Sequence, residues 1–132
     1  MKNYKELHIW QKGIEIVKQV YLLTKQFPDT EKFGIVSQIT RAAVSIPANI
    51  AEGSSRNSDK DYARFLQLSL GSAFEVQTYL VIAKEMNWAS LEGINIIELL
   101  LEEEIKMIHR FINTLNSSNN IQTLKEKLTA KG

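Results

Sequence analysis

Apolar residues recur at helical spacing along almost the whole chain. Near the start, Trp10, Ile14, Val17 and Tyr21 follow one another every three or four residues, and a second apolar row runs beside them. No stretch alternates between polar and apolar residues with the period of two that a half-buried strand requires. The pattern therefore predicts an all-α protein. The expected helices span residues 4–27, 31–53, 58–86 and 90–116.

Residues with known positional preferences mark several helix ends. Ser58 and Ser90 are expected N-caps, because their hydroxyls can accept hydrogen bonds from the first free amides of a helix. Asn87 is the expected C-terminal stop of the third helix, and Gly53-Ser54-Ser55 of the second. Pro47 lies inside the second helix, where it lacks the N–H that the helix needs. We therefore expect a kink at this position.

Four long helices with short connections favour an up-down-up-down antiparallel four-helix bundle. The expected bundle is one domain over residues 1–116. The segment Ser117-Ser118-Asn119-Asn120 interrupts the apolar pattern. Residues 117–132 are therefore predicted to form a flexible or weakly helical tail.

Length and composition agree with a single intracellular domain. The chain has 132 residues and no cysteine, which removes disulfides and thiolate chemistry and suits a reducing compartment. The first residues lack the apolar core of a secretion signal, and no apolar run approaches the roughly 18 residues of a membrane span. We expect a cytoplasmic protein that does not contact a membrane.

The second helix is unusually poor in charge. Between Lys32 and Arg56 the only charged residues are Arg41 and Glu52, whereas a surface helix of this length normally has a broad charged face. One bundle buries about one stripe of each helix, so a neighbouring subunit is the simplest additional cover. This sparse charge predicts a homo-oligomer.

Polar residues form one narrow stripe on the second helix and another on the third. If these helices form a hairpin that turns near Ser58, residues whose numbers sum to about 116 lie side by side. The resulting polar ladder pairs Arg41 with Glu75, Ser45 with Gly71, Asn49 with Gln67, and Glu52 with Arg64. Such a ladder would determine register more than it would add stability. The alternative is that Arg41 and Arg64 point separately to solvent.

The sequence contains no recognisable catalytic site. His8 and His109 lack the glutamate three residues earlier that a di-iron bundle uses. No nucleophile elbow, phosphate-binding glycine loop or dinucleotide fingerprint occurs. The cluster Glu102-Glu103-Glu104 is most simply the solvated face of the fourth helix. We therefore expect no catalytic residues, no metal, no cofactor and no small-molecule substrate.

A resemblance to a known family rests on residues 38–53, which read QITRAAVSIPANIAEG, followed by Arg56 and Arg64-Phe65-Leu66. Over about residues 5 to 115 the chain resembles the 23S rRNA-intervening-sequence protein family. The resemblance implies a four-helix bundle that assembles into a ring, commonly a pentamer, without an assigned enzymatic activity. The chain departs from the family pattern at Thr40, where a second basic residue is usual, and at Asn87-Trp88, where a glycine-aromatic pair is usual.

A related bundle, the accessory protein of diversity-generating retroelements, is associated with nucleic acid and a reverse transcriptase. The net charge of +1 does not itself indicate a polyanionic partner. The leading hypothesis is nevertheless a non-catalytic homo-oligomer that binds RNA, DNA or a ribonucleoprotein partner. The candidate contact residues are Arg41, Arg56, Lys60 and Arg64. The alternative is a protein-binding scaffold with no nucleic-acid role, in which the two polar stripes serve assembly.

Overall fold

The structure is a computed structural model that describes residues 3–130, apart from the side chains of residues 118–120, 122 and 130. Within this range the regular structure is helical and contains no strand, so the predicted all-α class is confirmed. The α-helices are α1 (His8–Thr24), α2 (Ile35–Ser54), α3 (Asp59–Glu85) and α4 (Leu91–Ala130). Two short 3₁₀ turns, η1 (Tyr4–Glu6) and η2 (Asp29–Glu31), precede α1 and α2.

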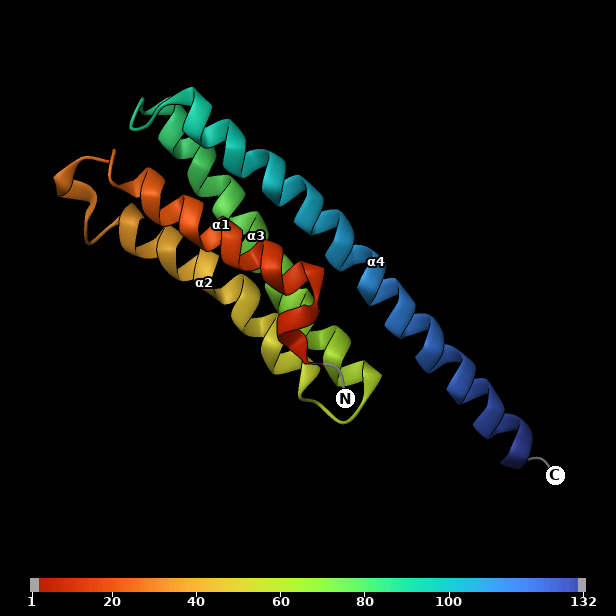
Figure 1. Cartoon of the computed structure of the whole chain (residues 1–132). Helices are drawn as coiled ribbons and strands as arrows, with labels where there is room; N and C mark the ends of the chain where they lie inside the picture. Colours follow the sequence, from red (N-terminus) through yellow and green to blue (C-terminus); the bar gives the residue numbers. More distant parts are fainter. Residues whose placement is uncertain (1–2, 131–132) are drawn as a thin grey trace.

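The four α-helices lie side by side, and successive helices run in opposite directions (Figure 1). Each helix contacts the next one along the chain, and α4 also contacts α1. The helices therefore enclose one core, which contains fully buried residues from all of them, including Ile16, Ile46, Leu66 and Leu101. Within residues 3–130, no helix has the length and the apolar run that crossing a membrane would require.

The predicted caps of α3 and α4 are confirmed. The Ser58 hydroxyl accepts a hydrogen bond from the Asp61 amide at 3.1 Å, and the Ser90 hydroxyl accepts one from the Gly93 amide at 3.1 Å. At the end of α3, Asn87 adopts a left-handed backbone with a φ of 57°.

This Asn87 conformation lets two amides bond back to α3. The Trp88 amide donates to the Ala83 carbonyl at 2.9 Å, and the Asn87 amide donates to the Lys84 carbonyl at 3.2 Å. This is the Schellman arrangement, in which glycine is most common and asparagine is tolerated. It explains why Asn87 can stand at a position where glycine is usual.

The N-terminal boundaries of the first two helices differ from the prediction. The first helix was expected from residue 4, but Leu7 is extended, with φ −72° and ψ 130°, and separates η1 from α1. The second was expected from residue 31, but η2 occupies that position and α2 begins only at Ile35. Periodicity could not detect these breaks, because helical turns on either side of each break keep the apolar spacing.

The predicted end of the fourth helix near residue 116 is wrong. Helix α4 continues to Ala130 and projects beyond the ends of the other helices (Figure 1). No proline or glycine occurs between residues 117 and 130, and Ile121, Leu124 and Leu128 resume the helical spacing, although each is more than half exposed. Weak helix formers at 117–120 therefore do not terminate the helix. Residues 1–2 and 131–132, at the ends of the predicted domain and tail, lie outside the described residues.

Candidate functional site

Two hydrogen bonds determine how α3 lies against α2. The Ser69 hydroxyl donates to the Ile46 carbonyl at 2.9 Å, and the Ser72 hydroxyl donates to Ser45 Oγ at 2.8 Å. Both pairs fall within one residue of the register predicted from the turn near Ser58, so that register is confirmed. Near the turn, Gly53 permits a close approach, because a Cβ atom there would lie 2.9 Å from the Phe65 Cβ.

Two of the four predicted ladder pairs, Arg41 with Glu75 and Ser45 with Gly71, are partly assembled. Arg41 and Glu75 line the same pocket, as their pairing required, but no ion pair joins them. Ser45 bonds to Ser72 rather than to its expected neighbour Gly71. Gly71 faces open space, because a Cβ atom added there would have no neighbour within 4 Å.

The other two predicted pairs, Asn49 with Gln67 and Glu52 with Arg64, are not formed among the described residues. The Asn49 side-chain amide donates a hydrogen bond to Ser45 Oγ, one turn earlier in α2, at 2.8 Å. Glu52 forms an ion pair with Arg56, which lies only four residues later in the sequence, before α3 begins. Neighbours three or four residues apart are already on one helix face, so they meet without a second helix.

Basic residues surround an aromatic ring at the turn between α2 and α3. The guanidinium carbons of Arg56 and Arg64 each lie 4.6 Å from the centroid of the Phe65 ring. Arg56 pairs with Glu52, and Arg64 Nε lies 3.7 Å from an oxygen of Asp61. The acidic partners offset the two positive charges, so this surface is a stacked group rather than a strongly basic patch.

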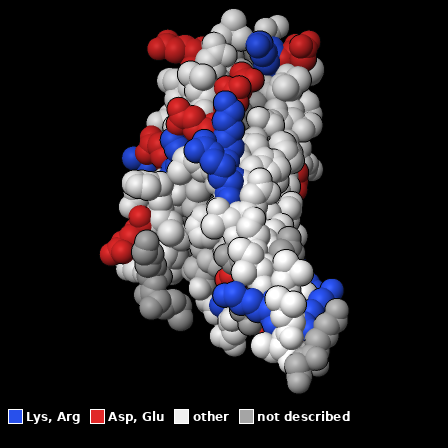
Figure 2. All heavy atoms as spheres, turned by 90° about the vertical axis from the view of Figure 1, so that its right-hand side faces the viewer, with Lys and Arg blue, Asp and Glu red and all other residues white. Residues whose placement is uncertain are grey.

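The other two candidate nucleic-acid-binding residues, Lys60 and Arg41, lie at different distances from this group. Lys60 is exposed in the first turn of α3, near the stacked arginines in sequence. Arg41 is also exposed, but about four helical turns separate it from Arg56 along α2. On the face shown in Figure 2, a short strip of described basic side chains is flanked by acidic ones. The structure therefore divides the predicted nucleic-acid residues into two groups.

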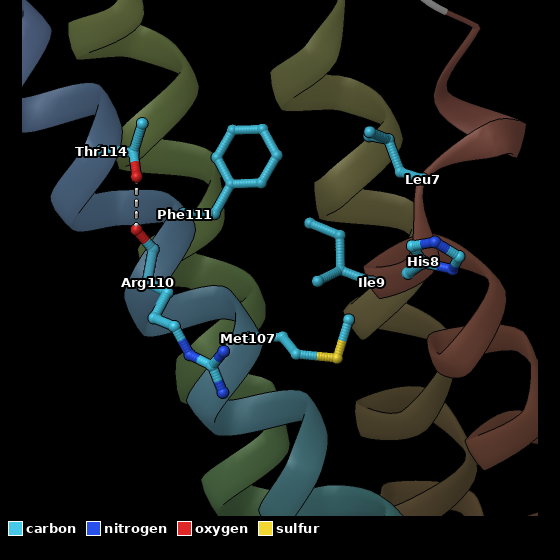
Figure 3. A pocket seen from close by; sticks show the side chains of 7 residues that line it. All are labelled: Leu7, His8, Ile9, Met107, Arg110, Phe111 and Thr114. Atoms are coloured by element: carbon cyan, nitrogen blue, oxygen red, sulfur yellow. Dashed lines mark hydrogen bonds between the residues drawn. The ribbon is translucent and has the colours of Figure 1, made fainter.

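An apolar groove of about 370 Å³ opens between the start of α1 and α4 (Figure 3). In Figure 3, Ile9, Met107 and Phe111 point toward its centre, with His8 and Arg110 at its margins. No hydrogen bond within the described residues involves the His8 side chain, so the groove shows no acid–base pair for catalysis. The groove was not predicted from the sequence, because its lining combines residues about 100 positions apart, such as Leu7 and Met107.

A smaller, polar pocket of about 300 Å³ lies between α2 and α3. Its lining consists of Gln38, Arg41, Ala42, Ser45, Ser72, Glu75 and Tyr79. The predicted ladder included Arg41, Ser45 and Glu75 but missed Ser72 and Tyr79. Tyr79 follows Glu75 by four residues, so helical spacing alone could have placed it on this face.

Glu104 lies inside the protein, which corrects its assignment to a solvated face. Its side chain is fully buried, and neither carboxyl oxygen has a hydrogen-bond partner in the part of the chain that is described. Burial raises the pKa of this carboxyl to about 8, although Lys12 nearby lowers it. Lys12 Nζ itself bonds to the exposed neighbour Glu103 at 2.5 Å. Burial therefore favours the protonated form of Glu104 at pH 7.

Metal ligands do not gather in the described part of the chain, since no group of three or more His, Cys, Asp or Glu side chains is close enough to hold an ion. Glu104 does not change this, because Glu102 and Glu103 beside it on α4 are exposed while Glu104 faces the core.

Comparison with known proteins gives one family and one fold. The profile of the family described as 23S rRNA-intervening sequence protein matches residues 5–110. A crystal structure from Bacteroides thetaiotaomicron, described as a protein of unknown function from the S23 ribosomal protein family, is similar with a TM-score of 0.73 and 25% identity. The similarity covers 79% of this chain and 97% of that one. No protein of curated function shows significant similarity to the chain.

Proposed function

Since the chain belongs to the 23S rRNA-intervening sequence protein family, whose solved relative is described as of unknown function, we propose that it is a non-catalytic cytoplasmic scaffold. In this proposal the four-helix bundle assembles with further copies of itself through the surface formed by α1 and α2. No catalytic family is indicated by the comparisons, which agrees with a binding role.

The observation that carries the proposal is an apolar surface across α1 and α2. A Cβ atom at Gly13 would lie 3.2 Å from the Pro47 side chain, so the middle of α1 lies against the middle of α2. Ile14, next to Gly13 on α1, is 36% exposed, and Tyr21, about two turns further along α1, is 51% exposed. Val44, about one turn before Pro47 on α2, is 43% exposed. Exposed apolar side chains gathered on neighbouring helices are typical of a protein–protein contact.

The charged residues of α2 leave this surface free. Arg41 lines the pocket toward α3, and Glu52 pairs with Arg56 near the turn. No other residue of α2 is charged. A second copy of the chain offers the same exposed apolar side chains and is the partner with matching chemistry. The family resemblance adds the expected form, a ring-shaped pentamer.

The assembly is tested by placing one charge on the proposed surface. We expect native protein to be multimeric by light scattering, and Ile14→Glu or Val44→Glu to reduce the mass toward that of one chain. The matched control is Leu99→Glu, because Leu99 is 62% exposed on α4 and its variant should keep the native mass. A monomeric native protein would contradict self-assembly. Loss of assembly in the Leu99 variant alone would contradict the choice of surface.

A second candidate function is nucleic-acid binding at the turn between α2 and α3. It is favoured by Arg56 and Arg64, whose guanidinium groups lie over the Phe65 ring, with Lys60 exposed nearby. Guanidinium and aromatic groups bind single-stranded nucleic acid through phosphate contacts and stacking. A phosphate would have to compete with Glu52 and the other acidic partners. Because phosphate contacts release counterions from the nucleic acid, binding should weaken as salt is raised.

The second candidate is tested by charge reversal. We expect Arg56→Glu with Lys60→Glu to abolish retention of single-stranded RNA at low salt. The matched control is Lys84→Glu, because Lys84 is exposed in the last turn of α3, at the opposite end of that helix from the turn. Unchanged retention in the double variant would show that this site assignment is wrong.

A further inference from the structure

The polar pocket between α2 and α3 has one positive and one negative side chain in its lining. Arg41 comes from α2 and Glu75 from α3, and both are exposed. No ion pair or hydrogen bond within the described residues involves either side chain. The pocket volume of about 300 Å³ is at the lower end of the range for small-molecule sites.

The wall between these charges contains a hydrogen-bonded pair of serines. Ser72 Oγ donates to Ser45 Oγ at 2.8 Å, and Asn49 Nδ2 donates to the same oxygen at 2.8 Å. A hydroxyl has two acceptor positions and one proton. The Ser72 hydroxyl also lies 3.1 Å from the Leu68 carbonyl, and its one proton serves only one of these two acceptors. When Ser72 donates to Ser45, the Ser45 proton can donate into the pocket; when Ser72 donates to Leu68, Ser45 can donate to Ser72.

Two further polar groups extend the lining along each helix. Gln38 lies one turn before Arg41 on α2, and Tyr79 lies one turn after Glu75 on α3. Neither side chain makes a hydrogen bond to another described residue. The pocket therefore presents an amide and a phenol in addition to its two charges and the Ser45 donor.

We propose that this pocket binds a small zwitterionic molecule, whose carboxylate contacts Arg41 and Ser45 and whose ammonium group contacts Glu75. A simple anion would be attracted by Arg41 but repelled by Glu75. A simple cation would be attracted by Glu75 but repelled by Arg41. A molecule with both charges is complementary to both side chains, and this complementarity provides specificity. Charge-assisted hydrogen bonds at each end would orient it.

This inference goes beyond the proposed scaffold function and uses a different surface. The zwitterion site lies between α2 and α3, whereas the proposed assembly surface lies across α1 and α2. Substitutions at the pocket and at Ile14 or Val44 can therefore be measured separately. Loss of one property does not require loss of the other.

The first experiment measures binding of unbranched amino acids by isothermal titration calorimetry. The probes are glycine, β-alanine, 4-aminobutyrate and 6-aminohexanoate, which separate a carboxylate and an ammonium group by increasing distances. We expect one length to bind most tightly and acetate or methylammonium alone to bind much more weakly. If no probe binds better than these singly charged ions, the proposal is overturned.

The second experiment assigns the binding to the pocket. Arg41→Gln and Glu75→Gln should each weaken binding of the best probe by at least about tenfold, since each removes one charge-assisted contact. Arg64→Gln and Glu52→Gln are matched controls outside the pocket and should bind as the native protein does. Circular dichroism checks that each variant is folded.

Two results of the second experiment would overturn the proposal. One is native affinity in both pocket variants, because binding would then lie elsewhere. The other is a loss of multimeric mass in Arg41→Gln without a response to any probe, because the pocket would then be an interface between copies of the chain.

Discussion

Glu104 lies where α1, α2 and α4 meet. A Cβ atom at Gly13 would be 3.2 Å from both Glu104 Oε2 and the Pro47 Cβ. Pro47 has no N–H to donate to the carbonyl four residues earlier, so α2 lacks one helical hydrogen bond here. An acid without a partner in such a site is held in its neutral form, because burial penalises its charged form.

This buried acid makes stability depend on pH. The unfolded carboxyl ionises near its ordinary pKa of 4.5, whereas the folded one keeps its proton until about pH 8. Between these values the folded state binds more protons, so the free energy of unfolding falls as pH rises. The full shift corresponds to roughly 5 kcal/mol. Urea unfolding at several pH values across this window measures the loss.

Two glutamine variants identify the group responsible. Glu104→Gln should remove most of this decline and make the protein more stable than native above pH 8, because an amide does not ionise. The exposed neighbour provides the control, and Glu103→Gln should keep the native pH dependence. An unchanged decline in Glu104→Gln would show that another group causes it.

Two glycines within helices should respond in opposite directions to alanine. At Gly13 a Cβ atom would press on Pro47 and the Glu104 carboxyl, and we expect Gly13→Ala to destabilise the protein by about 1–3 kcal/mol. At Gly71 the added atom has no neighbour within 4 Å. Gly71→Ala should therefore stabilise by about 0.5–1 kcal/mol through helix propensity. Denaturant unfolding of both variants measures the contrast, and equal effects would refute it.

At the scale of elements, α4 has two parts with different surroundings. Up to Leu115 one apolar row of α4 is buried in the core, including Ile94, Leu101 and Ile108, whereas Ile121, Leu124 and Leu128 are 54%, 60% and 71% exposed. An isolated helical segment of this length is only marginally stable without packing. The part beyond residue 116 also lies outside the family match, which ends at residue 110.

We therefore predict that truncation after Asn116 leaves the thermal unfolding midpoint unchanged. The helical circular dichroism signal should fall only by the share of the removed residues. A longer truncation after Arg110 also removes buried Ile112 and Leu115 and should lower the midpoint. If the shorter truncation lowered it as well, residues 117–130 would be contributing to the folded unit.

At the scale of the whole molecule, the two proposed kinds of contact should differ in their response to salt. Assembly through Ile14, Tyr21 and Val44 buries apolar surface, which salt does not screen. Nucleic-acid binding through Arg56 and Lys60 releases counterions and should weaken as salt is raised. We predict multimeric mass at both low and high salt, with co-purified nucleic acid only at low salt.

Light scattering with the ratio of absorbance at 260 and 280 nm measures both properties on one peak. A mass that fell at high salt would argue that charged groups, rather than the apolar surface of α1 and α2, hold the copies together. A peak free of nucleic acid at both salts would favour the scaffold without a nucleic-acid role.

Features that depend on neighbours within one helix or one turn could be predicted from the sequence. Apolar spacing predicted the all-α class, and Ser58, Ser90 and Asn87 marked real helix ends. The turn near Ser58 also predicted the register of α2 against α3, since a short connection leaves few ways for two adjacent helices to align. Helical spacing could also have separated Glu104 from the two exposed glutamates before it, because Glu104 lies three residues after Leu101 and four before Ile108, on the buried row of α4.

Which groups meet across helices depends on the packing of the folded protein. It buried Glu104 against Gly13 and Pro47, paired Glu52 with Arg56 instead of Arg64, and left Arg41 and Glu75 in one pocket without an ion pair. The physical reason is that helical spacing determines the face on which a side chain lies but not its distance from the neighbouring helix. That distance depends on how closely small residues such as Gly13 and Gly53 let the helices approach.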